Sequence, residues 1–142
     1  MIILDTNVLS ELVRPEPVQA VIDWVDAQPV ADLFITTLTQ AEILYGVALL
    51  PPGRRRRRLD DALQAILFED FRGRILTFDS LAAISYAEIA SSRRQTGRPI
   101  SQMDAQIAAI ARSQQAIVAT RNISDFEGCG VELINPWGLE VS

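Results

Sequence analysis

Five oxygen-bearing side chains stand where they could do chemistry together. Asp5 directly follows the first apolar run, Glu42 and Asp104 lie near the starts of two helical segments, and Asn122 and Asp125 follow a later apolar run. Carboxylates gathered at one place repel one another, and a bound divalent cation is the simplest way to relieve that repulsion. Oxygen ligands without histidine or thiolate suit Mg²⁺ or Mn²⁺ rather than zinc. The set therefore predicts a metal site of the kind that processes phosphate groups.

Each of these residues also has a purely structural interpretation when taken alone. Asp5 precedes a predicted helix and is suited to cap it, because an aspartate there accepts a backbone N–H. Glu42 and Asp104 each end a four-residue stretch, TQAE and SQMD, that matches the capping box. Turn chemistry accounts equally well for Asn122 and Asp125. The metal site is predicted from the whole set.

The helical phase of two acids favours the metal site. Asp104 shares a helix face with Ile107 and Ala111, which must turn toward the sheet, so its carboxylate is expected to point inward. Glu42 comes four residues after Leu38 and falls within an apolar stripe. That is an unusual place for a solvated glutamate.

The composition excludes several common catalytic sites. The chain has no histidine, so Ser-His-Asp triads, HExxH zinc sites and histidine acid-base catalysis are absent. The single cysteine, Cys129, can form no internal disulfide, and all 13 basic residues are arginine, which excludes the lysine of a P-loop or a Schiff base. The net charge of −5 is unusual for a nucleic-acid-binding protein, but it becomes −1 without the four predicted ligand carboxylates.

The length of the chain fits one domain. We expect a single domain over residues 1–142. No stretch approaches the ~20 apolar residues that a membrane span needs, so no membrane association is expected. No basic region precedes the first apolar run, so we expect no signal peptide and a cytoplasmic location.

Short apolar runs alternate along the chain with segments of helical periodicity. The runs predict strands at 2–4, 33–36, 75–78, 116–119 and 131–134. The periodic segments predict helices at about 7–13, 18–28, 38–50, 54–69, 80–95 and 102–114. Such alternation is typical of an α/β fold whose mostly parallel sheet is covered by helices on both faces. Ligands bind such sheets beyond the carboxyl ends of the strands, so this fold brings the predicted ligands together.

An ordered set of short motifs resembles those of the PIN-domain ribonucleases. The set consists of DTNVLSE at 5–11, AE at 41–42, Asp104 at the start of a helix, and TRN and DF within 120–126. Within that family the chain looks most like the VapC toxins, and its FitB-like features are GVALLPPG at 46–53, GRILTFD at 73–79 and NPW at 135–137. The resemblance covers nearly the whole chain.

The resemblance implies both a fold and an activity. The implied fold is a PIN-like α/β/α sandwich with a mostly parallel sheet of about five strands. The implied activity is Mg²⁺- or Mn²⁺-dependent endonucleolytic cleavage of RNA. Asp5, Glu42 and Asp104 match the three constant acids of the family, with Asp5 and Asp104 as the expected direct metal ligands.

The remaining site positions are implied less directly. Family members often carry aspartate where this chain has Asn122, and Asp125 is the nearby acid, so either residue is a candidate for the fourth position. We assign Asp125 to the predicted catalytic and metal-binding set and Asn122 to the pocket lining. Thr6 and Thr120 match the positions of hydroxyls that line such pockets.

The resemblance also implies partners. We expect a homodimer that acts as the toxin of a type II toxin-antitoxin pair. The cognate antitoxin would occupy the pocket, and DNA would be bound only through the antitoxin complex. The substrate would be RNA, although the sequence does not indicate which RNA is cut.

Five consecutive arginines, Arg54 to Arg58, form the most conspicuous charge run. Five helical residues span about 400° of arc, so they cannot all face one ligand. We favour a solvated helix start partly balanced by Asp60 and Asp61, with contact to RNA or the antitoxin as the alternative. The Gly128-Cys129-Gly130 segment lacks the third glycine of a dinucleotide-binding loop.

Other functions for an acidic pocket of this kind fit less well. Receiver domains and haloacid-dehalogenase-like phosphatases use a lysine, which this chain lacks, and DTN lacks the second aspartate of the phosphatase DxD motif. The remaining alternative is a PIN-like module that has lost catalysis and only binds nucleic acid or a partner protein. The presence of all three constant acids argues against that alternative.

Overall fold

A five-stranded sheet runs through the middle of the protein. The computed structural model describes residues 1–138, so the last four residues of the predicted domain, 139–142, lie outside the described residues. The strands are β1 (Ile2–Leu4), β2 (Leu33–Thr36), β3 (Ile75–Leu76), β4 (Ile117–Ala119) and β5 (Glu132–Ile134). They are ordered β3-β2-β1-β4-β5, and each described pair is parallel. The predicted α/β class and parallel sheet are confirmed.

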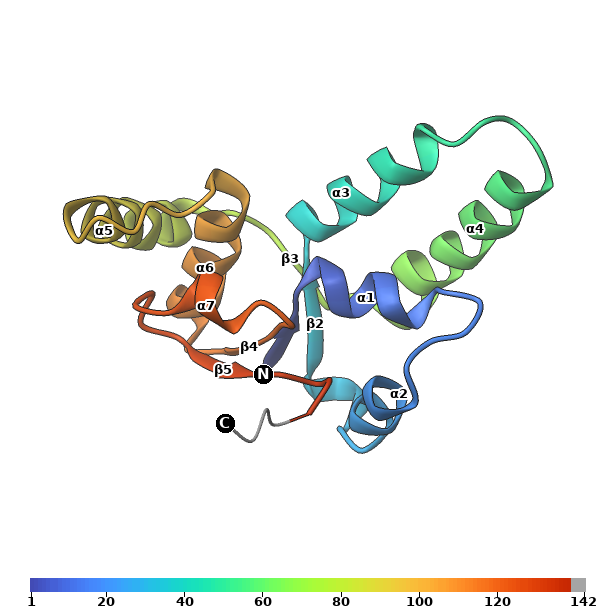
Figure 1. Ribbon diagram of the computed structural model, residues 1–142, viewed down its shortest axis with the longest axis horizontal. Helices are drawn as coiled ribbons and strands as arrows, with labels where there is room; N and C mark the ends of the chain where they lie inside the picture. The colour runs from blue at the N-terminus through green and yellow to red at the C-terminus, as the bar shows by residue number, and fades with distance from the viewer. Residues whose placement is uncertain (139–142) are drawn as a thin grey trace.

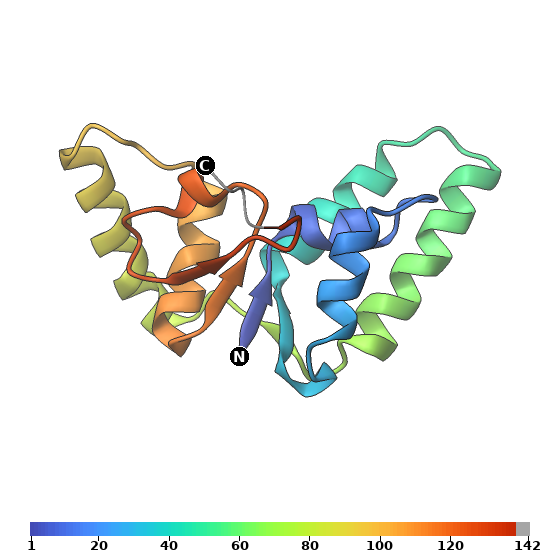
Figure 2. The same ribbon diagram turned by 60° about the horizontal axis from the view of Figure 1, so that its bottom comes forward.

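Helices cover the two faces of this sheet (Figures 1 and 2). The first group is α1 (Thr6–Leu12), α2 (Gln19–Asp26), α3 (Thr37–Ala48) and α4 (Arg54–Ala65). The second group is α5 (Ser80–Gln95), α6 (Gln102–Gln114) and the short α7 (Ile123–Phe126). No helix in the described part of the chain is long and apolar enough to cross a membrane.

The alternation of side chains along β1 builds a hydrophobic core on each face. Successive residues of a strand point to opposite sides of the sheet. Ile2 and Leu4 therefore pack with the first group of helices, where Leu63 of α4 is also buried. Ile3 packs in the other core with Ile107 of α6 and its buried alanines. One sheet thus supports two separate helical layers.

The edge strand β3 is shorter than predicted. It pairs only with β2, and the pairing is limited to Ile75 and Leu76. The prediction continued the strand to Phe78, but this ring packs edge-on against Tyr86 of α5, with the ring centroids 6.0 Å apart. Phe78 therefore belongs to the helix packing and not to the sheet.

Two other segments differ from their predicted form. The helix predicted over 54–69 is α-helical only to Ala65 and continues as a π-helical turn at Ile66–Asp70. The region after β4, predicted as a turn, contains α7, whose four residues are too few to show a helical period. A short 3₁₀ turn, Val30–Asp32, also precedes β2.

The register of the central strands determines which polar residues meet. Leu4 at the end of β1 lies opposite Ala119 at the end of β4. The backbone N–H of Asp5 continues this pairing by donating to the Ala119 carbonyl at 2.9 Å. Asp5 and Thr120 consequently emerge side by side at the carboxyl edge of the sheet.

Candidate metal site

Asp5 is buried at this edge and has two hydrogen-bond partners. It is the N-cap of α1, and its Oδ1 accepts the Thr6 N–H at 2.8 Å. Its Oδ2 accepts the Thr120 hydroxyl at 2.8 Å, and only 6% of the residue is exposed. The capping interpretation is therefore correct, but the cap uses only one carboxylate oxygen and leaves the other facing the sheet edge.

The other two residues of DTN organise the surroundings of Asp5. The Thr6 hydroxyl lies 2.9 Å from the Thr39 hydroxyl of α3. Asn7 donates through Nδ2 to Thr120 Oγ1 at 3.3 Å and accepts the Arg121 N–H at 3.3 Å. The motif therefore links β1 to both neighbouring strand ends. Thr39 and Asn7 were not among the residues predicted from the sequence, although the place of Asn7 within DTN is a signal for it.

Thr120 is fully buried and is the centre of the largest hydrogen-bond group at the site. Its Oγ1 accepts from Asn7 and from the Asn122 backbone N–H at 3.0 Å, while it donates to Asp5. With both lone pairs and the proton of the hydroxyl engaged, the orientation of the Asp5 carboxylate is fixed.

Glu42 lies half-buried on α3, one full turn inside the helix. Thr36 is the N-cap of α3, and its hydroxyl accepts the Thr39 N–H at 3.2 Å. Glu42 is therefore too far from the cap for the TQAE capping box, and that interpretation is wrong. Its carboxylate is available to the site, as its placement in the apolar stripe indicated.

Asp104 lies in the first turn of α6 and is half-buried. Ser101 is the N-cap of this helix, and its hydroxyl accepts the Asp104 N–H at 3.2 Å. The cap predicted from SQMD therefore exists. It fixes the backbone of Asp104 at the helix start, beyond the end of the sheet.

Three of the acids influence one another electrostatically. The pKa of Asp5 is raised mainly by burial and further by the charges of Asp104 and Asp125, while hydrogen bonds from Thr120 and Thr6 oppose the rise. Burial and neighbouring like charges thus disfavour the ionised carboxylate, and a cation beside it would favour that form.

The pKa values of Glu42 and Asp104 are raised as well. The pKa of Glu42 is raised by burial and by the charges of Asp5 and Asp104. Burial also raises the pKa of Asp104, Ser101 lowers it by hydrogen bonding, and the charge of Asp125 raises it further. The fold thus brings Glu42 within electrostatic range of Asp5 and Asp104, and Asp125 within range of the same two residues.

The two candidates for the fourth position contact the site in different ways. Asn122 contacts the site through its backbone N–H, which Thr120 accepts. Asp125 is exposed in the first turn of α7, yet its charge acts on both Asp5 and Asp104. Asp125 therefore supplies the negative charge that Asn122 lacks.

The donor set fits a hard divalent cation. It consists of carboxylates backed by hydroxyls, the ligands that Mg²⁺ and Mn²⁺ prefer. Within residues 1–138, no three or more acidic, cysteine or histidine side chains converge closely enough to form a preformed metal cluster. Mutual repulsion separates like charges, and a cation with its own waters requires direct contact with only one or two carboxylates.

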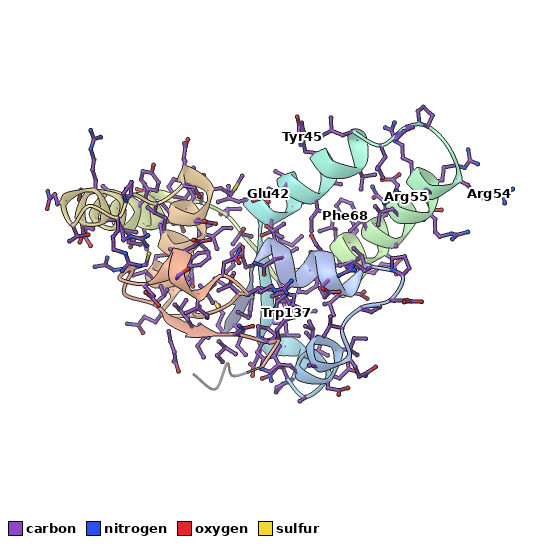
Figure 3. All side chains as sticks on the ribbon, in the orientation of Figure 1. Glu42, Tyr45, Arg54, Arg55, Phe68 and Trp137 are labelled. Atoms are coloured by element: carbon purple, nitrogen blue, oxygen red, sulfur yellow. The ribbon has the colours of Figure 1, made fainter. Side chains whose placement is uncertain are left out.

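A groove opens beside the acids. It has a volume of about 990 Å³ and runs between α1, α3 and α4. Glu42 is one of its lining residues, Val47 and Leu63 contribute apolar surface to it, and Arg55 is one of its basic residues. Figure 3 shows that Glu42 and the labelled arginines come from different helices, α3 and α4.

The arginine run divides between different environments, as its helical arc requires. Arg54, Arg55 and Arg58 line the groove. Arg56 is half-buried and donates to the Leu50 carbonyl at 3.4 Å. All of the five except Arg56 are exposed, which agrees with the predicted solvated helix start, and three of the exposed arginines also line the groove.

Taken together, these features define an α/β protein with an acidic pocket at the carboxyl edge of a parallel sheet. The PIN domain family matches residues 2–127 of the chain. The chain therefore belongs to the PIN-domain family, as its motifs predicted.

The relatives of the chain are toxins and ribonucleases of this family. It is 42% identical over 137 residues to the VapC ribonuclease Y4jK of Sinorhizobium fredii, a match that covers 96% of this chain and 98% of the relative. It is 40% identical over 137 residues to the toxin FitB of Neisseria gonorrhoeae, covering 96% and 99%. The structure of FitAB bound to an IR36 DNA fragment matches with a TM-score of 0.93 and 40% identity, covering 99% of this chain and 98% of that one. The resemblance to VapC-type toxins, including the FitB branch, is confirmed.

Proposed function

We propose that the protein is a Mg²⁺- or Mn²⁺-dependent endoribonuclease that acts as the toxin of a type II toxin-antitoxin pair. The observation that carries this proposal is the placement of the buried Asp5 at the carboxyl edge of the parallel sheet, with two further partly buried carboxylates, Glu42 and Asp104, on α3 and α6. The ribonuclease and toxin names of its relatives support it.

Each residue of the proposed site has its own role. Asp5 and Asp104 would bind the cation, with Glu42 and Asp125 adding charge around it. A bound cation supplies an activated water and stabilises the leaving oxygen in phosphodiester hydrolysis. Thr120 fixes Asp5 Oδ2 through its 2.8 Å hydrogen bond, which limits the reorientation needed when the cation binds.

The proposed partners are RNA as substrate and a cognate antitoxin. FitAB, the assembly in one matching structure, is bound to DNA, so we propose that this chain also binds DNA only through its antitoxin complex. The groove beside Glu42 offers apolar surface with arginines for a partner segment. We further propose that the protein is a homodimer in the cytoplasm.

One observation favours a second candidate function. The acids of the described residues do not converge into a preformed cluster, as would also be true of a PIN-like module that only binds nucleic acid or a partner. The two candidates differ in whether a cation produces cleavage.

Cleavage of RNA by site variants tests the proposal. Purified wild type should cut RNA when Mg²⁺ or Mn²⁺ is added, and Asp5→Asn and Asp104→Asn should each lose at least about 100-fold in rate. Asp26→Asn, at the exposed end of α2, is the matched control and should retain activity. Equal cleavage by wild type and both site variants would show that the site is wrong, whereas no cleavage by any of them would support the binding module.

Sequencing of RNA ends after induction in cells would identify the substrate. Ends enriched by wild type and absent with Asp104→Asn should share a sequence or structural context. If the two proteins gave the same RNA ends, the cleavage could not be assigned to this site.

A further inference from the structure

Arg93, near the end of α5, is a buried arginine that the sequence analysis did not assign to the site. Only 7% of the residue is exposed. Its Nε donates to the Arg98 carbonyl at 2.7 Å. Its Nη1 donates to the carbonyls of Asp125 at 2.9 Å and Glu127 at 2.8 Å and lies 3.6 Å from Cys129 Sγ. One side chain thus contacts segments from two distant parts of the sequence.

The charge of Arg93 is not matched by an ion pair in the described part of the chain. Its acceptors are carbonyl oxygens and a thiol, which satisfy the N–H groups without neutralising the guanidinium. The positive charge of Arg93 also lowers the pKa of the Asp104 carboxyl. Arg93 is therefore a buried positive charge placed beside an acidic site.

The loop that contains Gly128 and Cys129 packs against the Arg93 side chain. Gly128 has φ +77°, a conformation that favours glycine, and a Cβ built there would lie 3.8 Å from Arg93 Cδ. The neighbouring Cys129 is 2% exposed. The Gly128-Cys129 segment, which had no function in the sequence analysis, therefore packs against the Arg93 side chain.

We infer that Arg93 is a positioning residue for the acidic site. By donating to the Asp125 and Glu127 carbonyls it fixes the turn that carries the Asp125 side chain, and it places a permanent positive charge near Asp104. This inference rests on the proposed metal-dependent function of that site. A purely structural role would affect stability alone, so the two roles can be separated by experiment.

The test uses Arg93→Gln, Arg93→Lys and the control Arg94→Gln. Lysine keeps the charge but cannot reproduce the planar set of donors that spans three carbonyls. Arg94 is the next residue of α5 and is exposed. Melting curves of each protein should be recorded at increasing Mn²⁺ concentrations, and kcat and KM should be measured on one RNA.

For Arg93→Gln we expect the Mn²⁺ concentration at half-saturation to rise about tenfold. We expect kcat to fall about 10- to 100-fold, the usual cost of removing a group that orients a metal ligand, while KM changes less than about threefold. Arg93→Lys should lie between this variant and wild type, because it restores the charge only. Arg94→Gln should match wild type.

Labelling of Cys129 with a thiol reagent gives a readout that does not depend on activity. Burial raises the pKa of this thiol and Arg93 lowers it, so losing the arginine charge would by itself slow labelling. If Arg93 fixes the loop, Arg93→Gln should instead be labelled on the order of tenfold faster in the absence of metal, because the loop opens more often.

Several outcomes would overturn the inference. Wild-type Mn²⁺ affinity and kcat in a folded Arg93→Gln protein would do so, even if its melting temperature were lower. If Arg93→Gln does not fold, the same measurements on Arg93→Lys decide, and values equal to wild type would reject the inference. If wild type itself neither binds Mn²⁺ nor cleaves RNA, the proposed function fails, and unchanged Cys129 labelling would separately reject the role of Arg93 in fixing the loop.

Discussion

At the scale of single residues, the site depends on a carboxylate that the fold buries at a cost. Burial raises the pKa of Asp5, so the ionised form is less favourable in the folded protein than in the unfolded chain. The free energy of unfolding therefore falls as the pH rises from the ordinary aspartate pKa to the raised pKa of folded Asp5, and the acid has no effect at lower pH. The Thr120 hydroxyl reduces this cost by donating to the ionised form.

Removing that hydroxyl should have a pH-dependent effect. Thr120→Val should lower the free energy of unfolding at pH 7 by about 2 kcal/mol, because it leaves the ionised Asp5 oxygen and two N–H donors without their partner. The pKa of Asp5 should rise further, so the loss should shrink as the pH falls toward 4. Urea denaturation at several pH values measures this dependence.

Thr36→Val is the matched control for this effect. Thr36 is equally buried, but its hydroxyl accepts from a neutral group, the Thr39 backbone N–H. Its loss of stability should therefore be nearly constant over the same pH range. Parallel curves for the two variants would contradict the proposed coupling between Thr120 and the charge of Asp5.

At the scale of elements, the sequence correctly predicted the helices and strands that have a clear apolar pattern. β2, α5 and α6 have the predicted bounds, because each has a clear apolar pattern and the two helices have capping side chains at Asp79 and Ser101. Asp5 and Asp104 could be proposed from the sequence because one follows a strand and the other begins a helix, whereas Glu42 was proposed from its place in an apolar stripe. The element α7 was missed because it is too short to show a period.

The contacts between elements could not be predicted in the same way. Thr6 meets Thr39 across 33 residues, and Arg93 meets the Asp125 carbonyl across 32. Neither pair has a local signal, because the partners are defined by packing and not by spacing. For the same reason the sequence left Asn122 and Asp125 as alternatives, because the effect of the Asp125 charge on Asp5 and Asp104 depends on the folded arrangement.

The N-cap of α6 gives a prediction for this scale. Ser101→Ala should lower the free energy of unfolding by about 1 kcal/mol, because the Asp104 N–H loses its acceptor. It should also raise the pKa of Asp104 further, since a hydrogen bond with Ser101 lowers it. Urea denaturation measures the stability change, and NMR titration of the aspartate carboxyl measures the pKa.

Ser101→Asn tests whether capping is the cause. Asparagine is as good an N-cap as serine, so this variant should stay within a few tenths of a kcal/mol of wild type. If asparagine were as destabilising as alanine, the loss would have to arise from packing at this position.

At the scale of the whole molecule, two helical layers and one sheet enclose a site that repels its own charges. A divalent cation that binds only the folded protein should therefore stabilise all of it. At a Mn²⁺ concentration 100 times the dissociation constant, the gain should be about 2.7 kcal/mol. This corresponds to a rise in melting temperature of roughly 5–10 °C for a domain of this size.

Calorimetry or a dye-based melt with Mn²⁺ measures this stabilisation. Asp104→Asn should show a much smaller shift, whereas Asp26→Asn should shift as wild type does. A wild-type melting temperature that stayed constant up to millimolar Mn²⁺ would contradict the metal site and leave the binding module as the better description.

The pairing of β1 with β4 has a consequence for synthesis of the chain. Asp5 leaves the ribosome 115 residues before Thr120 and still further ahead of the turn that carries Asp125. Until β4 docks on β1, Asp5 lacks its hydroxyl partner, and it remains apart from Asp125. A chain that stops before β4 cannot form the complete pocket, so the proposed site exists only once β4 has been made and has docked.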